Sequence, residues 1–140
     1  MTIKSDYKHV KVKILKRLYP ERYDFEDGNW ISAEININLG IIKGLFSVNL
    51  RTDDFQIFLK ELKDLQLGKL SIAKFDTMEE GIHLKGVLNL NGNIEWDGVI
   101  KFGNDNDKLS FKLVSDNMSL DTIVSDIENI LKDYPVRGEI

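Results

Sequence analysis

The sequence predicts an α+β protein in which a single antiparallel sheet of about seven strands carries two amphipathic helices on one face. Two observations support this fold class. Seven segments alternate apolar and polar residues, the period of a half-buried strand, and two longer segments repeat apolar residues at helical spacing. The expected order is three strands, a helix, four strands and a final helix. Short turns between most neighbouring strands favour antiparallel pairing.

Residues 9–18 form the first expected strand, because Val10, Val12 and Ile14 share one face while histidine and lysines occupy the other. Two explanations of the lysines are open. They form a basic strip for RNA, or they protect an edge strand from pairing with another sheet. We favour the edge strand.

Residues 19–29 form a long connection with a proline, a glycine, four carboxylates and three aromatic rings, and they show neither helical nor strand period. Loops of this length are often functional, and aromatic residues among charges suit a protein interface. The other explanation is that Tyr23 and Phe25 close the end of the core. Both explanations stay open.

Two alternating runs, 30–39 and 42–50, predict the clearest hairpin. Their apolar faces match only if Leu39 lies opposite Ile42, because a shift of one residue would expose the whole apolar set. This register leaves a two-residue turn that begins with Gly40, and glycine in that position is typical of a type II′ turn.

The run that follows predicts a helix facing the core. Thr52 is expected to cap it, with Asp53 and Asp54 at the positive end of the helix dipole. Apolar residues then recur at helical spacing until Gly68, which ends the segment.

Four further strands are expected after this helix, at 69–76, 82–90, 94–102 and 109–113. The two middle strands form a hairpin, and matching their apolar faces pairs Leu90 with Ile94 around the three-residue loop 91–93. An apolar stripe over 120–134 predicts the closing helix, which Pro135 ends.

The length and composition limit the classes of protein. A chain of 140 residues fits one domain, so residues 1–140 are expected to share one core. Cysteine is absent, which excludes disulfides, thiolate nucleophiles and cysteine-bound metals. No segment resembles a signal peptide or a transmembrane helix, so we expect a cytoplasmic protein without membrane contact.

Charge is distributed unevenly along the chain. Residues 1–17 contain six basic residues and one aspartate, so the remainder carries −9 in a protein of formal net charge −4. An acidic body repels phosphate backbones and attracts basic proteins. We therefore expect no direct nucleic-acid binding and favour a cationic protein partner, although mild acidity is also common in ordinary soluble proteins.

Catalytic and metal-binding motifs are absent from the sequence. The two histidines, His9 and His83, fall on the polar faces of separate strands and do not form a zinc-binding pair. Glu95 and Asp97 lie two residues apart, but a solvated strand face is a simpler explanation than paired catalytic acids. We expect no enzymatic activity, no metal and no cofactor.

Four motifs occur in order along the chain: Asp27-Gly28-Asn29-Trp30, Leu50-Arg51-Thr52-Asp53-Asp54-Phe55, Phe75-Asp76-Thr77-Met78-Glu79 and Tyr134-Pro135-Val136-Arg137-Gly138. In order and spacing they resemble the WapI family of bacterial immunity proteins, over about residues 24 to 138. The chain departs from the family pattern before the last helix, where it carries Asp116-Asn117-Met118-Ser119-Leu120.

The resemblance implies a non-enzymatic antidote that binds the C-terminal toxin domain of a WapA-like polymorphic toxin, typically a tRNA-cleaving nuclease. Blocking would be steric and electrostatic, and an acidic antidote would meet a cationic nuclease faster. Contacts with one particular toxin belong in variable loops. We predict them at Tyr23, Asp24, Phe25, Glu26, Asp76, Glu79 and Glu80.

The shared motif residues are better explained as parts of the fold. We expect Trp30 to anchor the core, Arg51 to pair with a loop carboxylate, and Thr52 to cap its helix. The full structural set is Asp27, Gly28, Trp30, Gly40, Arg51, Thr52 and Asp53.

An alternative function, from a different class, is a small-ligand-binding module. In that case a curved sheet and two helices would enclose an apolar pocket. The apolar positions such a pocket needs are the same ones that a packed core needs, so an internal cavity is the feature that would favour this alternative.

Overall fold

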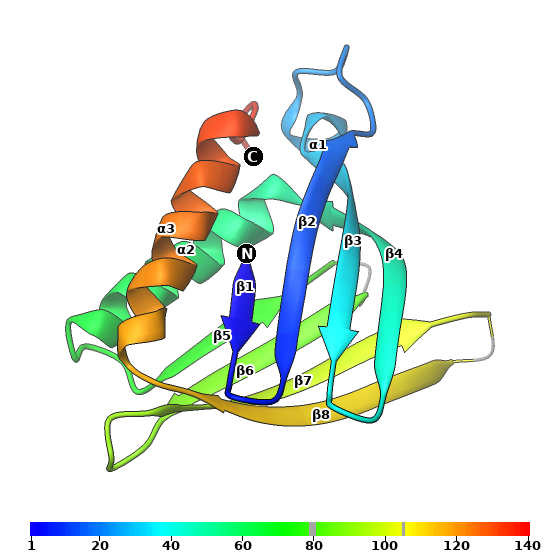
Figure 1. The fold of residues 1–140 in the computed structure, drawn as a ribbon. Coiled ribbons are helices and arrows are strands. Elements are labelled where there is room, and N and C mark those ends of the chain that lie inside the picture. The colour runs from blue at the N-terminus through cyan, green and yellow to red at the C-terminus, as the bar shows by residue number, and fades with distance from the viewer. Residues whose placement is uncertain (79–80, 105) are drawn as a thin grey trace.

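The computed structural model describes residues 1–78, 81–104 and 106–140. These residues form eight strands and three helices (Figure 1). In chain order they are β1 (Thr2–Lys4), β2 (His9–Arg17), α1 (Phe25–Gly28), β3 (Trp30–Asn38), β4 (Lys43–Arg51), α2 (Thr52–Gln66), β5 (Ile72–Asp76), β6 (Ile82–Leu88), β7 (Ile94–Phe102), β8 (Asp107–Ser115) and α3 (Met118–Asp133).

The strands make two antiparallel sheets, so the prediction of a single sheet of about seven strands was wrong. One sheet contains β1 to β4 and the other β5 to β8, each in chain order. Figure 1 shows the strands of the two sheets running in crossing directions, with α2 and α3 together on one side. Alternation reveals which side of a strand is buried but not which strands share a sheet, and β1 is too short to give a pattern.

The core combines the inner faces of both sheets with the apolar stripes of α2 and α3. Aromatic rings occupy its centre. Phe58 of α2 lies 5.1 Å from Phe75 and 6.2 Å from Trp96, measured between ring centroids, and Phe55 lies 4.8 Å from Phe75. Burying each of these side chains contributes roughly 1.5–3 kcal/mol.

The predicted hairpin between β3 and β4 is confirmed. The Leu39 N–H donates to the Ile42 carbonyl at 2.8 Å, and Gly40 has a φ of +92°, as its place in the turn requires. Further along β4, the Phe46 ring lies over Gly44, where an added Cβ would come within 2.7 Å of it.

The predicted register of β6 and β7 was wrong by two residues. Leu88, not Leu90, lies opposite Ile94, and the three-residue loop is 90–92, one residue earlier than expected. Gly92 takes the left-handed conformation in that loop, with φ of +80°. A shift of two leaves every side chain on the same face, so matching apolar faces cannot separate the two registers.

The strand predicted at residues 9–18 is an edge strand over only part of its length. β3 pairs with one side of β2, and β1 pairs with the other side over His9–Lys11. Protection of an edge therefore does not explain Lys11, whereas Lys13 and Lys16 lie beyond the part of β2 that β1 covers.

Candidate functional site

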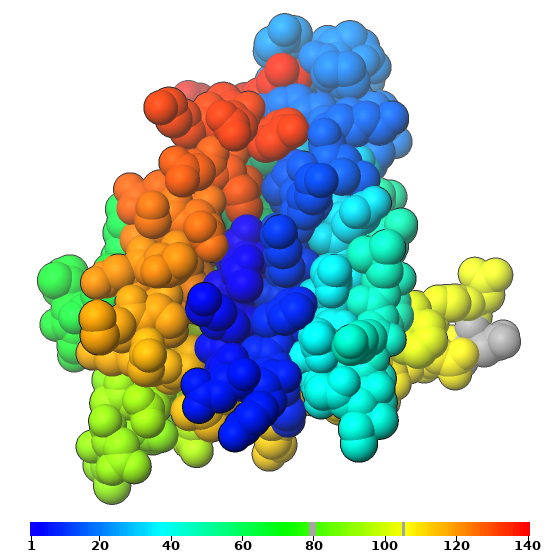
Figure 2. Space-filling view, viewed as in Figure 1, coloured from blue at the N-terminus to red at the C-terminus, as the bar shows by residue number. Residues whose placement is uncertain are grey.

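Three of the four sequence motifs meet at one end of the molecule, where the loop before β3 contacts the start of α2 and the C-terminal segment. Figure 2 shows the blue atoms near residue 20 beside the red atoms of the C-terminus. The contacts are made by polar side chains that bind backbone groups of the other segments. This cluster of Asn29, Arg51 and Arg137, with the segments they join, is called the anchor below.

Asn29 is the centre of the anchor. Its buried side-chain amide donates to the carbonyls of Phe25 and Arg137, each at 3.0 Å. Its Oδ1 accepts from the Thr52 hydroxyl at 2.9 Å and from the Arg137 N–H at 2.8 Å. Both ends of the amide are thus used, as a buried polar group requires.

Arg51 joins the loop to α2. Its guanidinium donates to the carbonyls of Phe25 and Glu26 at 2.7 and 2.6 Å, and to the Asp53 carboxylate at 2.9 Å. It also lies over the rings of Phe25 and Trp30, 5.1 Å from each centroid. The prediction that Arg51 pairs with a loop carboxylate was wrong. The loop contributes backbone carbonyls, and the carboxylate belongs to Asp53 of α2.

The predicted roles of Thr52 and Trp30 were also wrong. Arg51 occupies the cap position of α2 and makes no side-chain cap bond, while Thr52 is the first helical residue and uses its hydroxyl on Asn29. Trp30 is only half-buried and stacks on Arg51. The tryptophan in the core is Trp96. Of the other motif residues, buried Gly28 packs against the Arg22 carbonyl, where an added Cβ would come within 2.7 Å.

Arg17 and Arg137 attach the C-terminal segment. Arg17 donates to the carbonyls of Gly28 and Pro135, both at 2.6 Å, and Arg137 donates to those of Pro20 and Arg22. Burial, together with the charge of Arg137, lowers the pKa of Arg17 from its ordinary value. These bonds therefore hold the loop against the C-terminal segment.

The loop presents the first group of predicted contact residues. Tyr23 is 70% exposed and does not close the core, with Arg137 stacked 4.2 Å from its ring centroid. Asp24 caps α1 by accepting from the Asp27 N–H at 2.9 Å, and this bond lowers the pKa of Asp24. Phe25 is half-buried beneath Arg51, and Glu26 is exposed.

The turn after β5 holds the second group. Asp76 is exposed and lies 3.2 Å from the Nδ1 atom of His83. Thr77 is buried and its hydroxyl donates to the Ile82 carbonyl at 3.0 Å. The predicted contacts Glu79 and Glu80 lie outside the described residues.

The first turn of α2 lies between the two groups. Arg51 binds the loop, as described above, while Asp54 lies near the turn, where the backbone of Met78 partly opposes the rise in the pKa of Asp54. Burial and the neighbouring Asp53 raise the pKa of Asp54 to about 6. The structure thus brings Phe25 and Glu26 to one side of this helical turn and the segment after Asp76 to the other.

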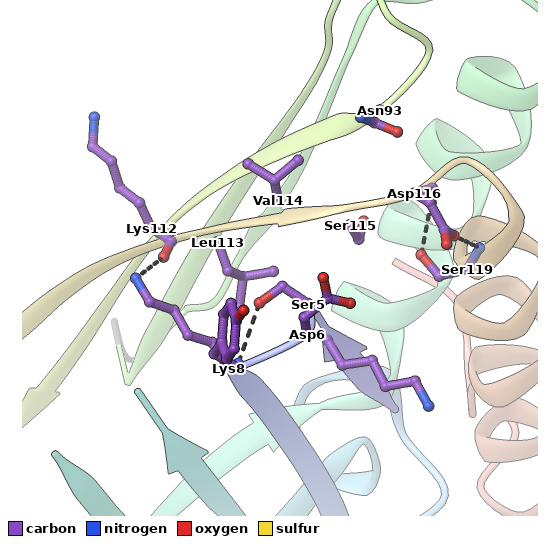
Figure 3. Close-up of a pocket in the computed structure, with 12 residues that line it drawn as sticks. Ser5, Asp6, Lys8, Asn93, Lys112, Leu113, Val114, Ser115, Asp116 and Ser119 are labelled. Carbon is purple, nitrogen blue, oxygen red and sulfur yellow. Dashed lines mark hydrogen bonds between the residues drawn. The ribbon is translucent and has the colours of Figure 1, made fainter. Parts of the chain in front are cut away.

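An open groove of about 1010 Å³ lies elsewhere, between the β1–β2 turn and β8 (Figure 3). The Nζ atom of Lys8 crosses it and donates to the Lys112 carbonyl at 2.9 Å. None of the predicted contact residues that the structure describes lines the groove. Lysine, serine and aspartate residues line much of it, so this groove does not support the alternative of an enclosed apolar pocket.

Asn29 and Arg137 lie within the sequence motifs, but no role was predicted for either residue. A signal for Asn29 was present, because it has the same parity as the buried residues Ile31 and Ala33 of the strand that follows. Within the described ranges, no three histidine or acidic residues are grouped to hold a metal ion. No helix in this part of the chain has the length and hydropathy to span a membrane.

The arrangement of two four-stranded sheets and two long helices resembles a known fold. WHY1 from Arabidopsis thaliana is 13% identical, with 97% of this chain and 89% of that chain covered and a TM-score of 0.53. MRP1/MRP2 from a Trypanosoma species is 8% identical, with 90% and 86% covered and a TM-score of 0.49. At these identities the likeness concerns the fold alone. No curated protein sequence matches the chain.

Fold and anchor together define a two-sheet α+β protein in which three of the four motifs join a loop, the start of α2 and the C-terminal segment. The family assignment is more specific. The chain belongs to the Immunity protein WapI-like family, which matches residues 1–135. The resemblance found in the sequence is thereby confirmed.

Proposed function

We propose that this protein binds and neutralises the C-terminal toxin domain, a tRNA-cleaving nuclease, of a WapA-like polymorphic toxin. It acts in the cytoplasm as one domain of residues 1–140, without catalysis, cofactor or direct contact with nucleic acid. The observation that carries this proposal is membership of the WapI-like immunity family over residues 1–135.

The proposed toxin-binding surface consists of the loop 19–26, the first turn of α2 and the turn that begins at Asp76. Its exposed aromatic residue, Tyr23, is the kind of side chain that contributes most to binding at interfaces. The anchor holds the loop in place before the partner arrives, which reduces the entropy lost on binding. Both features support a surface prepared for a protein partner.

Charge supports the same partner. Glu26 and Asp76 are exposed on the two sides of the surface, with Asp53 half-buried between them. A nuclease that grips RNA is cationic, so this surface would attract the toxin and then cover the groove that holds RNA. Inhibition would follow from occupancy of that groove, with no chemical step.

The test is co-expression with the toxin domain encoded immediately upstream. Wild type should restore growth and form a complex with the toxin, and Tyr23→Ala should weaken that complex about tenfold or more. Tyr7→Ala is the matched control, because Tyr7 is 84% exposed in the β1–β2 turn, outside the proposed surface. Absence of both rescue and complex with the wild-type protein would refute the proposed function.

A further inference from the structure

The two sheets have four edge strands, and helices cover two of them. On β1, the outward N–H of Thr2 donates to the Oδ2 atom of Asp126 in α3 at 3.1 Å. On β5, the outward N–H of Lys74 donates to the Oε1 atom of Glu61 in α2, also at 3.1 Å. These bonds occupy backbone groups that an added strand would need, which is one way proteins protect sheet edges.

The third edge, β8, is crossed by the β1–β2 turn. The Nζ atom of Lys8 occupies the outward carbonyl of Lys112 at 2.9 Å. β8 also carries several charged residues along its length, a second protective feature. On each of these three edges, at least one outward backbone group is therefore bound by another part of the fold.

The fourth edge, β4, is open from Lys43 to Asn49. Backbone bonds from Leu39 to Ile42 and from Thr52 to Asn29 show that even-numbered residues of β4 face β3. The odd-numbered residues therefore direct their N–H groups away from the sheet. Of the five odd-numbered residues, Arg51 is buried and the other four are exposed: Lys43, Leu45, Ser47 and Asn49. None of the N–H groups of these four donates to a described acceptor.

The surface beside this edge of the sheet is apolar. Phe46 lies 5.2 Å from Phe102 of β7, measured between ring centroids, and Phe102 is 41% exposed. A strand laid along β4 would direct alternate side chains onto this aromatic pair, because successive residues of a strand point to opposite faces. Backbone hydrogen bonds would give affinity, and the aromatic pair would select apolar residues at every second position.

The open edge also leads directly into the proposed toxin-binding surface. β4 begins at the exposed cation Lys43 and ends at Arg51, which is paired with Asp53 at 2.9 Å. Its inner face contacts the end of the turn after β5, since an added Cβ on Gly81 would lie 3.2 Å from Val48. A strand bound along β4 would therefore lie next to the proposed toxin-binding surface.

We propose that β4 accepts an extended strand of the toxin, which becomes the fifth strand of the first sheet. This strand carries apolar residues at alternate positions against Phe46 and Phe102 and an acidic residue near Lys43. A second copy of β4 does not offer this pattern, because β4 contains no carboxylate. The inference rests on the proposed function and names how the partner is held.

Ser47→Pro tests the proposal, because proline removes one outward N–H and leaves the bonds to β3 intact. Ser110→Pro is the matched control: Ser110 is an exposed serine on β8, and its N–H points outward because it has the same parity as Lys112. Binding of both variants to the inactivated upstream toxin domain is measured after thermal melts have established that they fold. Ser47→Pro should weaken affinity about tenfold to a hundredfold, and Ser110→Pro less than about twofold.

Hydrogen exchange on the wild-type protein provides a reading that does not depend on the variants. The amides of Leu45, Ser47 and Asn49 should exchange more slowly in the complex than in the free protein. If the wild type binds the toxin while these amides stay unprotected and Ser47→Pro binds normally, the strand proposal is wrong and the immunity function stands. If the wild type does not bind, the function itself fails. If Ser47→Pro instead dissociates a dimer of the free protein, the occupant is a second copy and the toxin strand is ruled out.

Discussion

Replacing Asp54 by asparagine should stabilise the protein at neutral pH, and the size of the effect follows from where the carboxylate lies. Oδ2 of Asp54 is buried without a hydrogen-bond partner among the described residues. Burial comes first and the charge of Asp53 second in raising the pKa of Asp54 from 3.8 to about 6. The folded state therefore holds the proton more tightly than the unfolded state does.

The sign of the pH dependence follows from linkage. Above pH 6 the carboxylate is charged in both states, and folding bears the full cost of burying that charge. Between pH 6 and about 4 the cost declines as the folded state takes up a proton, and below that range it vanishes. A shift of about two pH units corresponds to roughly 3 kcal/mol, which partial exposure reduces to about 1–2 kcal/mol.

Urea unfolding at pH 7.5 and pH 4 measures this difference. Asp54→Asn should exceed wild type by about 1–2 kcal/mol at the higher pH and equal it at the lower. Asp53→Asn is the control, because Asp53 neutralises the buried Arg51 and its loss should destabilise the protein. A stability gain in Asp54→Asn that is the same at both pH values, or no gain at all, would refute the reasoning.

Two further predictions concern the anchor and the acidic surface. Asn29→Ala should lower the free energy of unfolding by about 3 kcal/mol, because buried donors and acceptors lose their partners. Asn36→Ala, at an exposed position of β3, should change it by less than about 0.5 kcal/mol in the same urea titration. Charge reversal at Glu79 and Glu80 should slow association with the toxin at low salt, measured by stopped flow, whereas reversal at Glu95 of β7 should not. An unchanged association rate would remove the first pair from the interface.

Local patterning predicted pieces of this fold far better than it predicted their assembly. The hairpin at Gly40 was correct, because a wrong register there exposes a whole apolar face. The predicted register of the β6–β7 hairpin was wrong, because the predicted and observed registers differ by two residues and bury the same side chains. Separation into two sheets had no local signature, since α2 interrupts the strands in either arrangement.

The site shows the same limit. Tyr23 and Glu26 were predicted as toxin contacts because aromatic and acidic residues in a long loop are visible in a sequence, and their role as contacts stays a prediction. The bonds that hold this loop could not be predicted, because Arg51 and Arg137 bind backbone carbonyls. Every residue has a backbone carbonyl, so no sequence pattern marks these partners. The parity of Asn29 was the one readable clue to the anchor.

Anchoring through carbonyls has a consequence for how such a protein can diverge. Arg51 grips the loop at the carbonyls of Phe25 and Glu26, and Arg137 grips it at those of Pro20 and Arg22. Neither arginine reads the identity of the side chain it holds through these bonds. Loop side chains that do not stack on these arginines can therefore change while the backbone stays bound, so the proposed toxin-binding surface can change its specificity without a change of fold.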